Sequence, residues 1–348
     1  MYKLPAIVAL FLLAALPPPG FAAGVERLYE AEQPVSGQAA GERDAALRAA
    51  LGEVLVRITG ERGVLSHPAV QPLLADPAPY VQQYGYRTRP GAGSPAHPVQ
   101  DLWVRFDGAA LEREMRRQGL PFWGRERPVT LVWLAVEDFG ERYLVSAESD
   151  RDVRRFVEQA ARRRGIPVLF PLMDLEDQIR VRFADVWGGF LDSVVDASSR
   201  YTPQALLVGR LHRESEAVWS IRLTLWVRGA THAWERTRGG MEEVLVAGVE
   251  EAADRLAARF ALRGDGAGAT RLSLTVEDVR DLGDYARVSR YLTSLTPVRG
   301  LQVARLEPGR VEYRLDLRAD LQALEQLIAI DPLLEPVPGA QQVYRLRP

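Results

Sequence analysis

The chain has 348 residues, of which 47% are hydrophobic and 26% are charged, and its formal net charge is −2. This length suffices for two or three domains with separate cores, and the balanced charge excludes the clustered basic excess typical of nucleic-acid-binding proteins. The absence of cysteine excludes thiol nucleophiles, disulfides, cysteine-ligated zinc and iron–sulfur clusters. We therefore expect a folded protein with no nucleic-acid partner.

The first two dozen residues have the pattern of an export signal. Lys3 gives a positive n-region, Ala6 to Leu16 form an apolar run, and prolines precede the small residues that flank Phe21. The run is shorter than the ~20 apolar residues of a membrane span, and no cysteine follows it for lipid attachment. We expect a signal peptide over residues 1–22, a periplasmic mature protein that starts near Ala23 and no stable membrane span after cleavage; a retained signal anchor stays an alternative.

Residues 23–125 are expected to form an α+β domain of order βααββα. The helix Ala40 to Ile58 shows the clearest pattern, because its apolar residues recur at i, i+3, i+4 and i+7. Asp107 is a helix N-cap candidate. The other expected elements are a strand over Val25 to Val35, a helix from Ser66 to Leu74 capped by Ser66, strands over Tyr80 to Thr88 and Val99 to Phe106, and a closing helix to Gln118.

Residues 126–263 alternate strand and helix patterns and are expected to form an α/β sandwich with a mixed sheet. The apolar run Val129 to Val136, a helix capped by Asp150 and the run Gly165 to Phe170 read as a βαβ unit with two buried strands. The remaining elements are a helix over Phe190 to Ser199, strands over Ala205 to Leu211, Val218 to Val227 and Thr231 to Thr237, and a helix over Glu242 to Phe260.

A glycine-rich stretch, residues 264–269, has the composition of a linker. Its alternating glycines also suggest phosphate binding, but neither the preceding strand nor the following helix of such a loop is evident. Residues 270–348 then read as strand, helix, hairpin, helix and strand, with Glu307-Pro308-Gly309-Arg310 at the hairpin turn. The order βαββαβ predicts a ferredoxin-like domain, a plan that carries no function by itself.

Several short motifs carry a family resemblance. They include Leu28-Tyr29-Glu30-Ala31, Val54 to Gly60, Leu102 to Phe106, Leu120 to Gly124, Leu131 to Ala135 and Ala205 to Arg210. In these stretches the chain resembles the exported proteobacterial proteins grouped as domain of unknown function 2066, a family without an assigned reaction. The passage from Ala197 to Gly209, with the meander and long helix after it, looks like the α/β domain of the amino-terminal part of TolB and of curli-secretion lipoproteins. That likeness implies a binding or assembly module.

The densest polar group follows the strand that ends near Pro171. It consists of Asp174, Glu176, Asp177, Arg180, Arg182 and Asp185. Ligands bind at the carboxyl ends of strands in open α/β sheets, so these carboxylates are candidates for a divalent cation or an acid and base pair. However, Asp174 occupies an N-cap position and the other charges fit i, i+3 pairs on a solvated face. We favour this structural interpretation.

No other motif indicates catalysis or a cofactor. The histidines His67, His97, His212 and His232 include no pair at helical spacing, although His212 and His232 fall on strands of one expected hairpin sheet. The motifs G-x-S-x-G, H-E-x-x-H and S-x-x-K are missing from the sequence. We therefore expect no catalytic residue, no metal ligand and no cofactor.

Tryptophan is frequent, with seven residues. Trp103, Trp133 and Trp219 lie in apolar strand patterns and are expected in cores, whereas Trp123, Trp187 and Trp226 are candidates for domain packing or partner contact. The favoured hypothesis is a non-enzymatic binding or assembly module of the cell envelope with a protein partner, and the alternative is a periplasmic hydrolase or metal-dependent enzyme. The residues expected at the partner or ligand patch are Asp174, Asp177, Arg182, Asp185 and Trp187.

Overall fold

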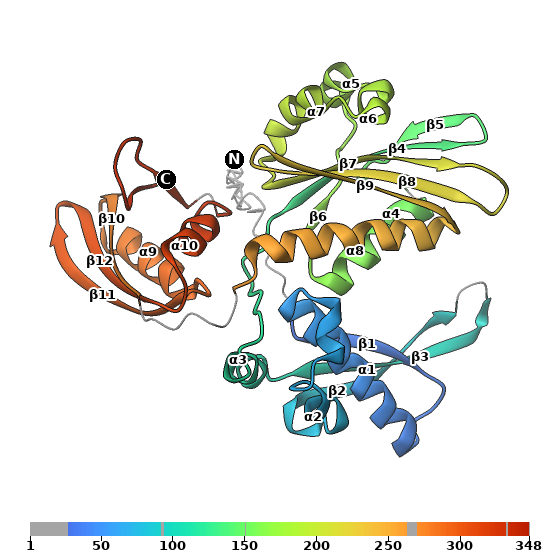
Figure 1. The fold of residues 1–348 in the computed structure, drawn as a ribbon, viewed down its shortest axis with the longest axis horizontal. Coiled ribbons are helices and arrows are strands. Elements are labelled where there is room, and N and C mark those ends of the chain that lie inside the picture. Colours follow the sequence, from blue (N-terminus) through green and yellow to red (C-terminus); the bar gives the residue numbers. More distant parts are fainter. Residues whose placement is uncertain (1–26, 92–93, 150, 263–269, 332, 348) are drawn as a thin grey trace, which may run out of the picture.

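The computed structural model describes residues 27–91, 94–149, 151–262, 270–331 and 333–347, and it contains three separate sheets (Figure 1). This arrangement confirms the expected multidomain α+β fold. The expected signal peptide (1–22) and linker (264–269) lie outside the described residues. The three sheets fall within the three segments proposed as domains, and the boundaries themselves stay a prediction.

The N-terminal sheet has the antiparallel order β1-β3-β2 and packs against one long helix. Helix α1 (Ala40–Thr59) buries its predicted apolar stripe on this sheet. The Asp107 carboxylate accepts a 3.0 Å hydrogen bond from the Ala110 amide and caps α3 (Gly108–Arg117), as expected. The strands are β1 (Glu30–Val35), β2 (Val81–Gly91) and β3 (Ser94–Phe106).

The predicted start of the second helix at Ser66 is wrong. Ser66 ends a 3-10 turn (Arg62–Ser66), and helix α2 spans only Gln71–Ala75. The reason is Pro68, because the residue before a proline is driven to extended backbone, and His67 has φ −73° and ψ 130°.

The middle sheet has the order β5-β4-β7-β8-β9, with β6 also paired to β4. Strand β4 is parallel to β6 and β7, whereas the other pairs are antiparallel, so the expected mixed sheet is confirmed. Helices α4 and α8 cover one face, and α5, α6 and α7 cover the other (Figure 1). The strands are β4 (Thr130–Asp138), β5 (Glu141–Leu144), β6 (Val168–Leu169), β7 (Ala205–Arg213), β8 (Trp219–Val227) and β9 (Ala230–Gly239). The helices are α4 (Asp152–Arg164), α5 (Leu175–Arg180), α6 (Phe183–Gly188), α7 (Leu191–Ser198) and α8 (Met241–Phe260).

Three details of this unit differ from expectation. Strand β6 has two half-buried residues rather than a long buried run, because the chain leaves the sheet at Phe170 to enter the α5–α7 layer. The hairpin strand β5 and helix α6 were not expected as elements, whereas α5 begins after Asp174, the residue expected at a helix N-cap position. The residue before α4 is Arg151, and the expected cap, Asp150, lies outside the described residues.

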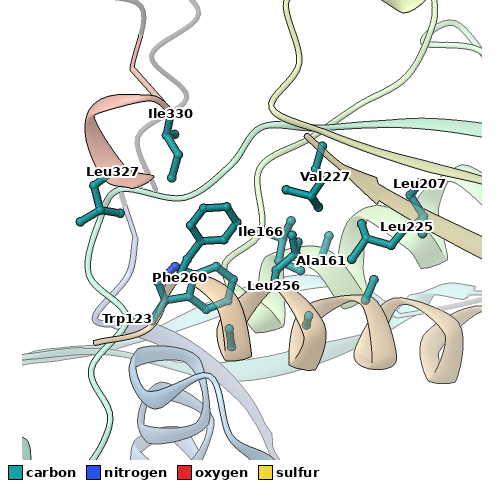
Figure 2. Packing of buried hydrophobic residues seen from close by; sticks show 14 of the residues in the cluster. Trp123, Ala161, Ile166, Leu207, Leu225, Val227, Leu256, Phe260, Leu327 and Ile330 are labelled. Atoms are coloured by element: carbon teal, nitrogen blue, oxygen red, sulfur yellow. The ribbon is translucent and has the colours of Figure 1, made fainter. Parts of the chain in front are cut away.

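The C-terminal sheet has the order β11-β12-β10-β14-β13. Its elements are β10 (Thr270–Val279), α9 (Leu282–Ser294), β11 (Val298–Glu307), β12 (Gly309–Leu317), α10 (Leu321–Ile328), β13 (Leu334–Pro336) and β14 (Val343–Leu346). The expected succession βαββαβ is present, but the ferredoxin-like topology is not fully reproduced. Strand β14 runs parallel to β10, because the additional edge strand β13 reverses the chain before β14. Figure 2 shows Leu327 and Ile330 of this unit beside Phe260 and Trp123, so one apolar cluster continues from the middle unit into the C-terminal unit.

Buried arginines join the N-terminal and middle units. Arg57 near the end of α1 donates from Nε to the Arg163 carbonyl of α4 at 2.9 Å. In return, Arg164 at the end of α4 donates from Nη2 to the Gly60 carbonyl that follows α1, at 2.8 Å. Each helix thus satisfies the other's C-terminal carbonyls, which have no partner within their own helix.

Arg127 lies between these two helix ends. Its Nη1 donates to the Arg164 carbonyl at 2.9 Å and its Nη2 to the Arg57 carbonyl at 2.8 Å, while its guanidinium stacks 4.1 Å from the centroid of Trp123. Burial, together with the neighbouring Arg57, lowers the pKa of Arg127 to about 9. The guanidinium therefore stays charged at neutral pH, where every donor of the fork can bind a carbonyl.

Glycines make room for α8 at the end of α1 and for Arg57 at the end of α4. Gly60 and Gly165 end α1 and α4 with φ of +75° and +67°. A Cβ atom on Gly60 would lie 2.2 Å from the Cβ of Ala257, and one on Gly165 would lie 2.9 Å from the Cγ of Arg57. Both the left-handed backbone and the available space thus require glycine.

We predict that Arg164→Met lowers the free energy of unfolding by about 3 kcal/mol, because it leaves the buried Gly60 carbonyl without this donor and removes one cation from the ion pairs of Glu250 and Asp254. Arg164 is only 2% exposed and binds Gly60, Glu250 and Asp254. The matched control is Arg163→Met, whose side chain is exposed, with an expected change within about 0.5 kcal/mol. Urea unfolding measures both, and equal losses in the two variants would contradict the assignment.

Candidate partner-binding surface

The sequence-predicted residues gather in the α5–α7 layer, at the carboxyl end of β6. The chain leaves β6 at Leu169, turns at Met173 with a positive φ of 56°, and starts α5 after Asp174. The Asp174 carboxylate accepts a 3.1 Å hydrogen bond from the Asp177 amide. Asp174 is therefore the helix N-cap that its sequence position indicates.

Asp177 is the buried centre of the layer. Its side chain is 0% exposed, and its Oδ2 accepts hydrogen bonds from the Met173 amide at 2.9 Å and the Tyr201 hydroxyl at 2.5 Å. Its Oδ1 accepts from Arg200 at 3.1 Å. The buried carboxylate is thus paired and hydrogen-bonded, as a buried charge must be.

Arg200 closes the group from the other side. Its Nη1 and Nη2 donate to the two oxygens of Asp174 at 2.7 and 2.8 Å, a bidentate pair. This contact lowers the pKa of Asp174 to about 2 and raises that of Arg200. Burial and the bond to Asp177 raise the pKa of Tyr201 to about 12. We call Asp174, Asp177, Arg200 and Tyr201 the acidic lock.

The polarity of helix α5 is consequently inverted, with a polar side chain buried and apolar side chains exposed. Its carboxylate at Asp177 points inward, whereas its two large apolar side chains, Leu175 and Ile179, are 73% and 72% exposed. These residues are four apart and so lie on one helix face. Leu172, just before the helix, is also exposed. We call Leu172, Leu175 and Ile179 the α5 face.

The other predicted patch residues belong to α6. Asp185 accepts a 2.7 Å hydrogen bond from the Arg182 amide, so this pair fixes the start of α6. Trp187 is half-buried, stacks on Phe183 with ring centroids 5.3 Å apart, and meets His212 edge-on at 6.1 Å. The structure thus brings Asp174 and Asp177 together, and it places Arg182, Asp185 and Trp187 on the next helix.

This geometry assigns the carboxylates a structural task. Asp174, Asp177 and Asp185 each accept bonds from protein donors. Within the described residues, no group of three or more His, Asp or Glu side chains is arranged to hold a metal ion. His212 and His232 do not meet, because His212 faces Trp187 whereas His232 is opposite Leu225, whose side chain lies in the core on the other face.

The tryptophans follow expectation in part. Trp103, Trp133 and Trp219 are buried. Trp123 is also buried and packs between units, which is the domain-packing alternative rather than partner contact. Trp226 is half-buried against the α5–α7 layer, and Trp187 keeps an accessible part.

A concave region lies beside α1, and residues of α4 and α8 complete its lining. This cleft of about 540 Å³ is lined by Ala45, Ala49, Gly52, Leu65 and Leu74 among others. Its charged lining is largely bonded within the protein, since Arg48 donates to the Leu74 carbonyl and Arg62 pairs with Asp254. Unlike α5, the cleft does not combine a buried carboxylate with exposed apolar side chains on one helix, so we do not choose it as the candidate surface.

Sequence reasoning missed the partners of the acidic lock and the exposed apolar pair. Arg200 and Tyr201 follow α7, more than twenty residues after Asp177, so no local spacing connects them. A signal for the inversion was present in Leu175-Glu176-Asp177-Gln178-Ile179, where the two apolar residues share a face with no apolar continuation.

Comparison with known proteins gives one match. Residues 22–124 match the family model described as Domain of unknown function (DUF8605). No curated protein and no solved structure matches the chain. The resemblance to domain of unknown function 2066 is therefore wrong, and the likeness to the TolB and curli-secretion domains has no support. Two of the motifs that suggested domain of unknown function 2066, Leu102 to Phe106 and Leu131 to Ala135, are largely buried strand sequences. Apolar strand sequences of this kind occur in the cores of many folds.

We predict that substitutions at Asp177 and Ile179 of α5 differ strongly in their effect on the free energy of unfolding. Asp177→Ala leaves the Tyr201 hydroxyl and the Met173 amide without this acceptor and removes one of the carboxylates that Arg200 binds, and it should lower the free energy of unfolding by about 3 kcal/mol. Ile179→Ser removes an exposed side chain and should change it by less than about 0.5 kcal/mol. Urea unfolding compares the two, and a larger loss for Ile179→Ser would show that α5 is not inverted.

Proposed function

We propose that this protein is a non-catalytic binding module of the bacterial cell envelope, which docks a protein partner on the α5 face. The observation that carries the proposal is the inversion of α5. Exposed apolar side chains rimmed by polar residues are typical of protein interaction sites. Here two of them share the face of a helix whose inward position holds a carboxylate.

The acidic lock supports docking because it holds the α5 face in place before a partner arrives. Asp177, Arg200 and Tyr201 attach a six-residue helix to the rest of the layer through side-chain bonds. A helix this short is not stable alone. A preorganised face loses less conformational entropy on binding than a mobile one.

The charges around the face favour a protein over a lipid surface. Arg180 pairs with Glu176 at 3.2 Å and Arg200 pairs with Asp174, so these arginines are neutralised locally. Binding to anionic lipid requires a cluster of several uncompensated Lys or Arg residues. None of the described helices combines the length and apolar character that would allow it to cross a bilayer.

The proposed compartment is the periplasm, and its support is the pattern of Lys3, the apolar run Ala6 to Leu16 and the small residues around Phe21. The alternative of a hydrolase or metal-dependent enzyme at Asp174 to Asp185 gains no support from the site, since those carboxylates bind Arg200, Tyr201 and backbone amides.

A photo-reactive amino acid at position 179 tests docking in intact cells. We expect a discrete cross-linked species from Ile179, and we expect the added mutation Leu175→Ser to reduce its yield about fivefold or more, by the ~1–3 kcal/mol that an apolar hot spot contributes. The matched control is the same photo-reactive residue at Leu282, which is 79% exposed on α9 of the C-terminal unit. Equal adducts from positions 179 and 282, or none from 179, would count against the α5 face.

A further inference from the structure

The open part of the middle sheet carries two opposed arginines. Arg210 on β7 and Arg222 on β8 are direct cross-strand partners. The Cβ atoms of such partners are about 5 Å apart, and like charges directly opposite each other destabilise a sheet. Among the described residues, no carboxylate oxygen lies within 4.0 Å of either guanidinium. This pair is therefore an uncompensated concentration of positive charge.

The neighbouring acidic groups do not neutralise it. Glu235 is the cross-strand neighbour of Arg222 on β9, but it forms no ion pair with it. Glu137 lies on β4 opposite His212 and pairs with Arg142 at 3.3 Å. Two arginines thus share a sheet face on which Glu235 is not paired with Arg222 and Glu137 is paired with Arg142.

Trp187 and His212 form one side of this region. The guanidinium carbon of Arg210 lies 5.5 Å from the centroid of the Trp187 ring, which holds the half-buried side chain beside α6. His212 follows Arg210 by two residues, so both side chains are on the same face of β7. Its Nδ1 is buried and has no hydrogen-bond partner among the described residues.

We propose that Arg210 and Arg222, with His212 beside them, bind a phosphate group. Each guanidinium presents a planar fork of donors, and two forks carried on directly opposite strand positions can together satisfy the several oxygens of a tetrahedral dianion. A carboxylate has only two oxygens, which one fork satisfies. A bound dianion also cancels the two opposed charges. The ligand is inorganic phosphate or a larger molecule that ends in a phosphate monoester, and the site is independent of docking on the α5 face.

The competing interpretation is an ordinary surface pair, in which Arg222 turns toward Glu235 and supports the sheet. The two interpretations differ in the stability of Arg222→Gln without ligand. A supporting arginine gives a lower melting temperature when it is removed. A repelled arginine gives an unchanged or higher one.

The test uses the full chain, its Arg210→Gln and Arg222→Gln variants, and Arg299→Gln as a control on an exposed arginine of the C-terminal unit. Inorganic phosphate and acetate are titrated by calorimetry at low salt. Vesicles of phosphatidylcholine with phosphatidic acid are tested by co-sedimentation, which distinguishes a lipid-borne phosphate from a free one. Melting temperatures are measured with and without phosphate.

We expect phosphate to bind at least tenfold more tightly than acetate, and each of the two variants to weaken that binding at least tenfold, while Arg299→Gln does not. Vesicle binding that is lost in both variants, without binding of free phosphate, also supports the site and assigns the phosphate to a lipid. Binding of neither probe, binding retained in the variants, acetate as tight as phosphate, or a lowered melting temperature for Arg222→Gln without ligand would overturn the proposal.

Discussion

The reciprocal capping of α1 and α4 by each other's arginines determines how the N-terminal and middle units lie together. A helix end leaves carbonyl groups without intrahelical partners, and in a buried position these carbonyls need donors from elsewhere. Arg57 and Arg164 supply them across the joint, and Arg127 bonds to both ends at once. Because the positions of the carbonyls determine the position of each guanidinium, the hydrogen bonds restrict the movement of α1 relative to α4.

This joint assigns opposite roles to the two faces of the middle sheet. The α4 and α8 face packs on the N-terminal unit, and the end of α8 reaches the C-terminal unit through Phe260 (Figure 2). The α5–α7 face lies on the other side of the sheet (Figure 1). The α5 face and the Arg210 and Arg222 pair both belong to this second side. Packing against the N-terminal unit thus uses one side of the sheet, and both features proposed for binding lie on the other side.

The fold was largely predictable because its elements have clear periodic patterns. The stripe of α1 and the alternation of β8 gave correct elements, and Asp107 and Asp174 were recognisable as caps. Short elements such as β5 and α6 were missed because four to six residues contain too little periodicity. The His67–Pro68 peptide moved the start of α2, a local effect that apolar spacing does not reveal.

The candidate site was predictable only in its acidic half. Asp174 and Asp177 were found by their density, but their partner Arg200 comes from the end of another helix, and the exposure of Ile179 follows from that pairing. Likewise, the opposition of Arg210 and Arg222 depends on the register of β7 against β8. In the sequence alone, each of these two arginines is an ordinary polar position of an alternating strand. Tertiary register and side-chain pairing, rather than composition, create both features.

Hydrogen exchange of the protein alone and with the partner captured through position 179 tests the central claim most directly. The account predicts slower amide exchange over residues 172–190, because docking covers the α5 face and stabilises the short helices. It also predicts unchanged exchange over residues 45–74, which include most of the apolar cleft along α1. Slower exchange confined to residues 45–74, with none at 172–190, would contradict the account and move the binding surface to the N-terminal unit.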